Sequence, residues 1–328
     1  MIRILSKAEE GAFHLVEGSL AARLALEAHV EERPRLWFDL TAPTREEVDL
    51  VQSHLRFAEY SWEDALRPGH PPKVEEVTDE ASRSSYLFVV SRAPEASGAA
   101  ESEGVALFMR TRLLVSVHSQ PSARVDAAVE RVLRDPKQTL GYGIELVAHA
   151  VLDEFVEGYG PALDAFEGKL EELEEDVARV HTSCDLNVIL KLRQSATQLY
   201  REARPMRDVM ASLAREGHPL IKPKARVAFR DLYDHIQRTL DRLEGDRELI
   251  ASLRDAYLAL QNNRMNEVMK TLTVVSVISG TLAMVTGAFG MNLHIPGSDS
   301  PFGFWIAILG MLGLAAVIFL LFRWKRWV

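Results

Sequence analysis

Two long apolar runs near the C-terminus dominate the hydrophobic pattern of this chain. Residues 272–290 and 304–322 contain no Asp, Glu, Lys or Arg, and each run is 19 residues long. A helix needs about 20 apolar residues to cross the hydrocarbon of a bilayer, and a soluble domain seldom buries a helix that is apolar on every face. The pattern predicts a hairpin of two transmembrane helices joined by a short loop at 291–303.

Positive charges lie at the outer ends of this predicted hairpin. Arg264 and Lys270 precede the first span and a basic tail at 323–328 follows the second, whereas the joining loop has no Lys or Arg. Flanks rich in Lys and Arg stay in the cytoplasm. We therefore expect a multi-pass protein of the inner (plasma) membrane, with cytoplasmic N- and C-termini and an outward-facing loop.

The two spans differ in composition. The second contains no Ser, Thr, Asn or Gln, whereas the first carries hydroxyl and small residues at Thr273, Ser276, Ser279, Gly280, Thr281, Ala283, Thr286 and Gly287. Such residues favour contact with protein or water over lipid. We assign the first span to a pore wall or a helix–helix interface and the second to the lipid bilayer. One hairpin cannot enclose a channel, so a pore requires a homo-oligomer.

The N-terminal part alternates strand and helix patterns. Strand patterns occupy 36–43, 84–92 and 104–119, the last as a hairpin around 110–112. A helix pattern at 44–57 begins with Thr44 and Glu47, which are spaced as a capping box. We expect a mobile loop at 93–104. The pattern predicts a cytoplasmic α/β domain over 1–138, of α/β/α type, without fixing its strand order.

From about residue 139 the pattern is helical, which predicts a cytoplasmic bundle over 139–224. A heptad seam comprises Leu163, Phe166, Leu170, Leu173, Val177 and Val180. Acidic residues fill the other faces of this helix, as a solvated surface or as a funnel that concentrates cations. The following helix, 186–215, is basic and could pair with acidic neighbours.

A single long helix is predicted after the bundle. No proline occurs between Pro223 and Pro296, so residues 225–290 could form one helix about 100 Å long that continues into the first span. Such a helix could transmit a cytoplasmic event directly to a pore.

Composition narrows the function classes. The 328 residues carry a formal charge of −9, which argues against nucleic acid as a partner and suits the attraction of cations. The single Cys184 excludes an internal disulfide, and the N-terminus lacks the pattern of a cleaved signal peptide. The chain has no GxxxxGK[ST], HExxH or G-x-S-x-G motif, so we expect neither an enzyme nor an organic cofactor.

Three motifs resemble the CorA family of divalent-cation (Mg²⁺/Co²⁺) transporters. They are FRDLYDH at 229–235, NEVMKTLT at 266–273 and GMN at 290–292, the last at the end of the first of two C-terminal spans. Residues 71–77 and 101–118 fit the family's N-terminal domain more loosely. The resemblance implies a funnel-shaped homopentamer of the inner membrane that carries Mg²⁺, often with Co²⁺ and Ni²⁺.

The resemblance also implies site residues. Gly290, Met291 and Asn292 match the outer entrance of the pore. With the polar first span, it gives as pore-lining residues Asn266, Met269, Leu272, Thr273, Ser276, Gly280, Ala283 and Gly287. Mg²⁺ keeps several waters in its octahedral shell, and a ring of neutral amide oxygens could hydrogen-bond that shell without trapping the ion. Alternatively, Asn292 is a helix C-cap, a position that Asn and Gly both favour.

Two aspartates match cytoplasmic positions of the family. Asp231 resembles a metal-sensing aspartate, and Asp255 lies at the inner mouth. If Asp231 binds Mg²⁺ between subunits, internal Mg²⁺ would favour the closed state. Alternatively, Asp231 is an ordinary surface residue. The candidates for its partner are Glu75, Glu76, Asp79 and Glu80.

The sequence departs from the family at two places. Many members have Met-Pro and a nearby Thr in the first span, whereas this chain has Gly280-Thr281 and Ala283. We therefore expect a hydrophobic gate to rely on Met269 and Leu272, or on Met284 if the helix rotates. The outer loop carries Asp299 as its only acid.

Two alternatives follow from these residues. Zinc-transporting relatives share the architecture, commonly with Val in place of Met in GMN, so Met291 favours Mg²⁺ and Co²⁺ over Zn²⁺. The long helix and the heptad seam would also suit a membrane-anchored scaffold or sensor that transports nothing.

Overall fold

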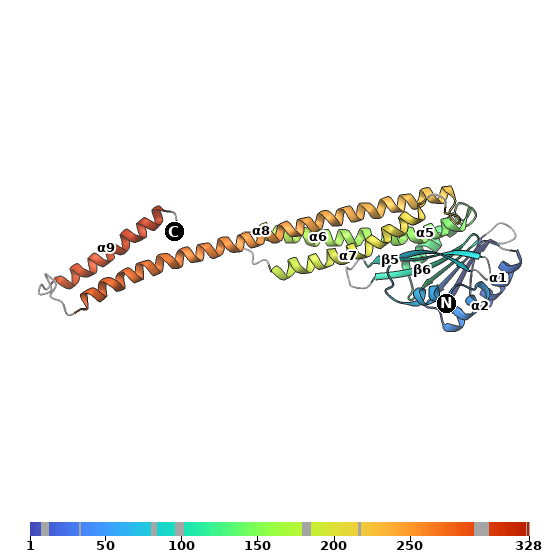
Figure 1. The fold of residues 1–328 in the computed structure, drawn as a ribbon, viewed down its shortest axis with the longest axis horizontal. Coiled ribbons are helices and arrows are strands. Elements are labelled where there is room, and N and C mark those ends of the chain that lie inside the picture. The colour runs from blue at the N-terminus through green and yellow to red at the C-terminus, as the bar shows by residue number, and fades with distance from the viewer. Residues whose placement is uncertain are drawn as a thin grey trace. The chain divides into compact units, whose positions relative to one another are not determined.

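The computed structural model describes residues 1–7, 13–32, 34–79, 84–95, 102–178, 185–215, 218–291, 302–325 and 327. Within them the chain divides into two compact units, Met1–Ser252 and Leu253–Val328 (Figure 1). The first unit contains a β-sheet and eight of the described helices, the last of which continues into the second unit. The predicted boundaries at residues 138 and 224 stay predictions.

A seven-stranded sheet lies at the centre of the N-terminal unit. Its strands are β1 (Ile2–Lys7), β2 (Phe13–Glu17), β3 (Leu36–Thr41), β4 (Lys73–Asp79), β5 (Ser84–Pro94), β6 (Ser102–Arg110) and β7 (Leu113–His118). Their spatial order is β2-β1-β3-β7-β6-β5-β4. Only β3 and β7 pair in parallel among these neighbours.

Helices cover both faces of the sheet, which confirms the α/β/α prediction. One face carries α1 (Ser19–Glu32), α2 (Arg45–Leu55) and α3 (Glu59–Leu66); the other carries α4 (Ala123–Arg134) and α5 (Ile144–Glu157). Strand residues alternate between the two faces. Phe38, Phe88 and Phe108 pack with Trp62 in the core on the α1–α3 side.

The local predictions in this unit are largely confirmed. In the capping box of α2, the Glu47 backbone N–H donates to Thr44 Oγ1 (3.3 Å) and the Thr44 N–H donates to Glu47 Oε2 (2.9 Å). Strands β6 and β7 form the predicted hairpin. The predicted loop at 93–104 is shorter than expected, because Ala93 pairs with Glu103 and Pro94 with Ser102 at the far end of the β5–β6 ladder.

The heptad seam lies on α6 (Tyr159–Ala178), where Leu163, Phe166, Leu170, Leu173 and Val177 are all buried as predicted. Val180 lies outside the described residues. The basic helix is α7 (Leu186–Leu213), which packs on α6. Two acids of α6 are paired from another part of the chain, since Arg242 Nη2 lies 3.0 Å from the Asp164 carboxylate and 2.6 Å from the Glu167 carboxylate.

The predicted long helix is α8 (Pro223–Phe289), which runs for 67 residues without interruption. The second span is α9 (Gly303–Trp324). Both helices are long and apolar enough to cross a membrane. Their composition and the absence of proline inside α8 account for these bounds.

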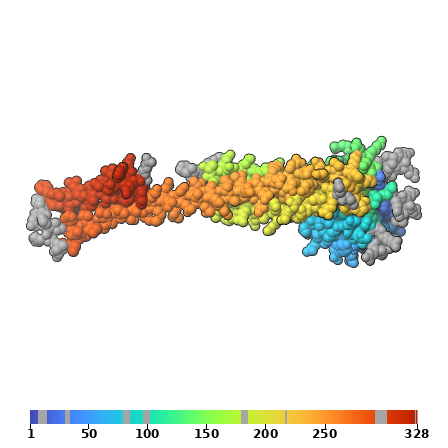
Figure 2. Space-filling view, turned by 45° about the horizontal axis from the view of Figure 1, so that its top comes forward, coloured from blue at the N-terminus to red at the C-terminus, as the bar shows by residue number. Residues whose placement is uncertain are grey.

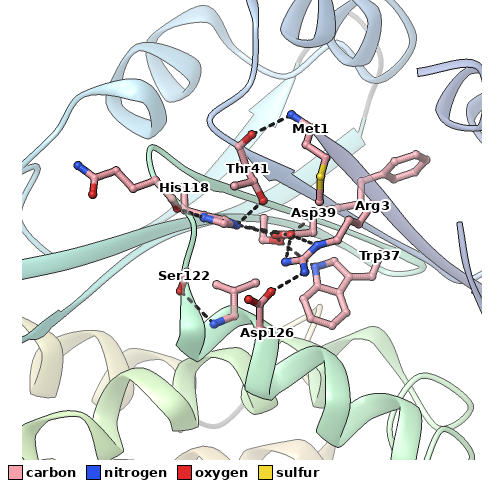
Figure 3. A network of polar contacts seen from close by, with 12 residues as sticks. Met1, Arg3, Trp37, Asp39, Thr41, His118, Ser122 and Asp126 are labelled. Carbon is pink, nitrogen blue, oxygen red and sulfur yellow. Dashed lines mark hydrogen bonds and ion pairs between the residues drawn. The ribbon is translucent and has the colours of Figure 1, made fainter. Parts of the chain in front are cut away.

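A buried polar network joins the sheet to α4 (Figure 3). Asp39 of β3 is fully buried; one carboxylate oxygen accepts from Arg3 Nη2 (2.6 Å) and the other lies 3.2 Å from His118 Nε2. Ser116 Oγ donates to the same carboxylate, and Asp126 of α4 pairs with Arg3. A buried carboxylate is stable only when such partners replace water.

This pairing shifts both pKa values. Burial disfavours the charged forms of Asp39 and His118, but their mutual hydrogen bond and attraction outweigh it. The pKa of Asp39 is therefore lowered, and the pKa of His118 is raised above its ordinary 6.5. The stability contributed by Asp39 is lost as pH falls below 3.8 and through its folded pKa. The contribution of protonated His118 is lost as pH rises above 6.5 and through its raised pKa.

We predict that His118→Gln destabilises the N-terminal unit by about 3–5 kcal/mol at pH 6, since it leaves Asp39 buried beside one fewer cation. Thermal unfolding of the full chain between pH 6 and 9 should show the wild type losing stability as pH rises, with a flatter profile for His118→Gln. If the wild type and His118→Gln lost stability equally with rising pH, the proposal that Asp39 and His118 form a charged pair would be wrong. Arg112→Gln, at an exposed turn, serves as the control.

Candidate functional site

The candidate site lies on the part of α8 that belongs to the C-terminal unit. Seven of the predicted pore-lining residues alternate in spacing between three and four, at positions 266, 269, 273, 276, 280, 283 and 287. At about 100° per residue, these seven and Leu272 fall within an arc of about 120° around the helix. They therefore form one continuous face, which we call the α8 stripe.

The α8 stripe is largely exposed within a single chain, and at one end Asn266, Met269 and Thr273 line a hollow together with Trp327. Met269 and Leu272 are 53% and 57% exposed, and all other stripe residues except the half-buried Thr273 are exposed as well. Gly280 and Gly287 have no side chain or distant backbone within 4 Å of an added Cβ. Packing inside one chain therefore does not explain why these positions hold small residues. An opposing helix or a water-filled space next to them would explain it.

The opposite face of α8 is the one that is covered. Val274 is only 5% exposed, and Ile278, Leu282 and Val285 are half-buried. Helix α9 lies beside this part of α8 (Figures 1 and 2), and its own half-buried residues recur on one side at Ala307, Met311, Ala315, Ile318 and Phe322. The half-buried face of α8 is thus the one toward α9, and the α8 stripe lies on the exposed side.

The threonine hydroxyls of the span are satisfied by the helix itself. Thr273 Oγ1 donates to the Met269 carbonyl (2.7 Å) and Thr281 Oγ1 donates to the Val277 carbonyl (2.7 Å). A hydroxyl whose hydrogen is engaged in this way still offers its lone pairs. In the α8 stripe, Thr273 therefore presents an acceptor oxygen, which suits the outward-pointing hydrogens of water bound to a cation.

The end of α8 carries the predicted entrance residues. The Gly290 N–H donates to the Thr286 carbonyl (2.9 Å), and Met291 is 59% exposed just after the last turn. A Cβ on Gly290 would lie 3.3 Å from the Thr286 carbonyl oxygen, which is a tight contact. Asn292 lies outside the described residues, so its roles as pore entrance and as C-cap both stay predictions.

Asp255 lies on the same side of α8 as the stripe. At about 100° per residue it falls about 20° from Asn266 around the helix axis. It is exposed and bonds Arg254 of the preceding position (2.8 Å). Asp255 therefore extends the α8 stripe toward the N-terminus of the helix with one negative charge per chain.

Asp231 is an exposed residue of α8 in the N-terminal unit. In the described part of one chain, no group of three His, Cys, Asp or Glu side chains could hold a metal ion, so Glu75 and Glu76 do not complete a site with Asp231. Glu80 and the side chain of Asp79 lie outside what the structure describes. A metal site at Asp231 therefore needs ligands beyond the described side chains of one chain.

The structure adds a titratable neighbour of Asp231 that the sequence did not indicate. His149 of α5 packs edge-on to Phe229 at 5.6 Å, and burial lowers its pKa although Asp153 and Asp231 both oppose that shift. The sequence could not indicate that His149 lies near Phe229 and Asp231, because a single histidine in an apolar helix belongs to no recognisable motif.

Comparisons with known proteins match nearly the whole chain. The family described as CorA-like Mg²⁺ transporter protein matches residues 35–326. The cobalt/magnesium transport protein CorA of Methanocaldococcus jannaschii is 26% identical over 330 residues, covering 100% of both chains. The complete structure of the CorA magnesium transporter from that organism has a TM-score of 0.82 at 23% identity and covers 100% of this chain and 99% of its own. The zinc transport protein ZntB of Pectobacterium atrosepticum is 25% identical over 68% of each chain.

We predict that water reaches the α8 stripe but not the face toward α9. In a Cys184→Ser background, Ser276→Cys and Ala283→Cys in membranes should react with a charged, membrane-impermeant thiol reagent at least about tenfold faster than Ile278→Cys and Leu282→Cys, because a thiolate forms only where water enters. Mass labelling of the purified chains measures this. Equal reaction on both faces would remove the α8 stripe as a water-lined surface.

Proposed function

The chain belongs to the CorA-like Mg²⁺ transporter family and is a divalent-cation transporter, and from this premise we propose that it forms a homopentameric channel for Mg²⁺ influx. Co²⁺ and Ni²⁺ would pass as well. The proposed pore crosses the inner membrane, with the N-terminal unit in the cytoplasm, and internal divalent cations close it.

The α8 stripe is the observation that carries this proposal. Each chain supplies one uncovered face of small and polar residues and covers the opposite face with α9. A single such face cannot surround an ion, so several copies would have to place their stripes around a common axis. In that arrangement α9 separates α8 from the lipid, in keeping with its lack of Ser, Thr, Asn and Gln.

The proposed chemistry is passage of an ion that keeps its waters. Mg²⁺ dehydrates reluctantly, so a wall that accepts hydrogen bonds from its bound water costs less than one that must replace it. Asn266, Thr273 and Ser276 offer such acceptors, and Gly280 and Gly287 leave room for the hydrated ion. Met269 and Leu272 supply the bulky apolar side chains at which a narrow pore would dewet and close.

We predict that Asn292→Ala lowers Mg²⁺ uptake at least about tenfold, since it removes one amide oxygen per chain from the proposed outer ring, and several hydrogen bonds of about 0.5–1.5 kcal/mol each would be lost together. The measurement is uptake by a strain without its own Mg²⁺ importers, at matched protein levels. Asn263→Ala is the control, because Asn263 lies on α8 about 60° outside the stripe. Wild-type uptake by Asn292→Ala would exclude the amide ring.

Closure by internal Mg²⁺ has its own test at Asp231. We predict that Asp231→Ala raises the internal Mg²⁺ concentration needed for half-inhibition by at least about threefold, because each copy loses one carboxylate ligand. Flux from proteoliposomes with buffered internal Mg²⁺ measures this. Asp234→Ala, an exposed acid one turn along the same helix, should leave inhibition unchanged. Identical inhibition in all three proteins would remove Asp231 from the sensor.

Zinc transport is the second candidate, and similarity to a zinc transport protein supports it. Met291 favours Mg²⁺ and Co²⁺, as noted above. Running the uptake comparison with Mg²⁺, Co²⁺, Ni²⁺ and Zn²⁺ separates the two, because a zinc transporter would show Asn292-dependent uptake of Zn²⁺ alone.

A further inference from the structure

A polar hollow in the N-terminal unit takes no part in the proposed pore. It lies where the loop after α3 passes over β5 and β6, and it holds about 440 Å³ of empty space, part of it open to solvent. Its polar walls come from Asp64, Arg67, His70, Arg92 and Ser119. We call it the Arg92 hollow.

Small residues in register create the floor of the hollow. Arg92 of β5 stands opposite Gly104 of β6, and Val90 stands opposite Ala106, which in turn pairs with Val117 of β7. A Cβ on Gly104 would meet Arg92 Cγ and the Ser91 carbonyl at 3.6 Å, an ordinary contact. The missing side chain at Gly104 is therefore not required by the backbone, and its absence leaves space beside the guanidinium.

Arg92 is a half-buried cation without a carboxylate in contact. Its Nε donates to Ser102 Oγ and its Nη2 to the Ser102 carbonyl, both at 3.0 Å, and no described acid forms an ion pair with it. Glu202 of α7 acts on it only at longer range. The remaining Nη1 lies 3.4 Å from where a Cβ on Gly69 would stand, so the missing side chain at this residue, held at φ +80°, leaves that nitrogen open on this side. Buried charges are normally paired.

The other charges leave the hollow positive. Asp64 is neutralised by Lys73, whose Nζ lies 2.6 Å from its carboxylate and 2.9 Å from Glu75, and His70 Nε2 lies 3.4 Å from Asp64. Arg67 is exposed and forms no ion pair in the described chain. Arg67 and Arg92 therefore line the space together with Asp64, whose carboxylate is bonded by Lys73; Lys73 in turn also bonds Glu75.

We propose that the Arg92 hollow binds a phosphate group, either free phosphate or the phosphate monoester of a small metabolite. Guanidinium groups match the oxygens of phosphate and bind them by charge-assisted hydrogen bonds. Arg92 Nη1 and Arg67 supply the charge, and the Ser119 hydroxyl supplies a further donor. This site is independent of the proposed pore, and its test measures binding rather than transport.

The test is calorimetric titration of the detergent-solubilised full-length protein, without Mg²⁺, with inorganic phosphate and separately with adenosine monophosphate. Arg92→Gln and Arg67→Gln should each weaken binding at least about tenfold, since each removes a charge-assisted contact. Gly104→Val should weaken binding similarly by filling the space while every charge is kept. Arg112→Gln removes an exposed arginine elsewhere on the sheet and should bind as the wild type does.

Each outcome decides the proposal. Saturable binding of either probe that depends on Arg92, Arg67 and Gly104 supports it, and the tighter probe identifies free phosphate or a monoester as the source. Arg67 is exposed, so its variant should fold even if Arg92→Gln does not. Saturable binding of neither probe to the wild type, or binding that Arg67→Gln and Gly104→Val leave unchanged, would overturn it.

Discussion

Hydrocarbon cannot solvate hydroxyl groups, acidic groups or the backbone that small residues leave exposed. This constraint decides which faces of the helices in the C-terminal unit can contact lipid. Helix α8 satisfies some of these polar groups itself, because threonine hydroxyls donate hydrogen bonds to backbone carbonyls one turn earlier in the helix. Helix α9 covers the apolar face but leaves the α8 stripe bare. A lone hairpin in a membrane would expose that stripe to lipid, and the proposed association with further copies would remove this unfavourable contact.

The N-terminal unit meets a related constraint by a different route. Its sheet buries a carboxylate, an imidazole and most of a guanidinium between β1, β3, β7 and α4. Since each charge there depends on its neighbours, the network favours the arrangement in which all of them meet. The network thereby favours the pairing of β1 with β3 in the observed register. Hydrophobic contacts alone would specify this register less strictly.

The features predicted correctly are those that a local pattern encodes. Charge-free runs gave the two spans, the absence of proline gave the length of α8, and the spacing of Thr44 and Glu47 gave the start of α2. Strands β1, β2 and β4 were not predicted, since their residues are short or rich in charge and acquire strand structure by pairing. The network of Arg3, Asp39 and His118 was not predicted, because it depends on partners up to 123 positions apart in the sequence. At the candidate site the polar face was predictable, whereas the ligands that accompany Asp231 involve distant parts of one chain or other chains.

The absence of a proline kink makes the C-terminal half of α8 a rod that can turn as a whole. Val277 and Met284, which are 40% and 79% exposed, lie about 60–80° around the axis from the centre of the stripe. A twist of about one fifth of a turn would bring these two bulky side chains to the centre of the face that the α8 stripe occupies. In the proposed pore, rotation of α8 about its own axis would therefore replace small and hydroxyl side chains by bulky apolar ones along the wall.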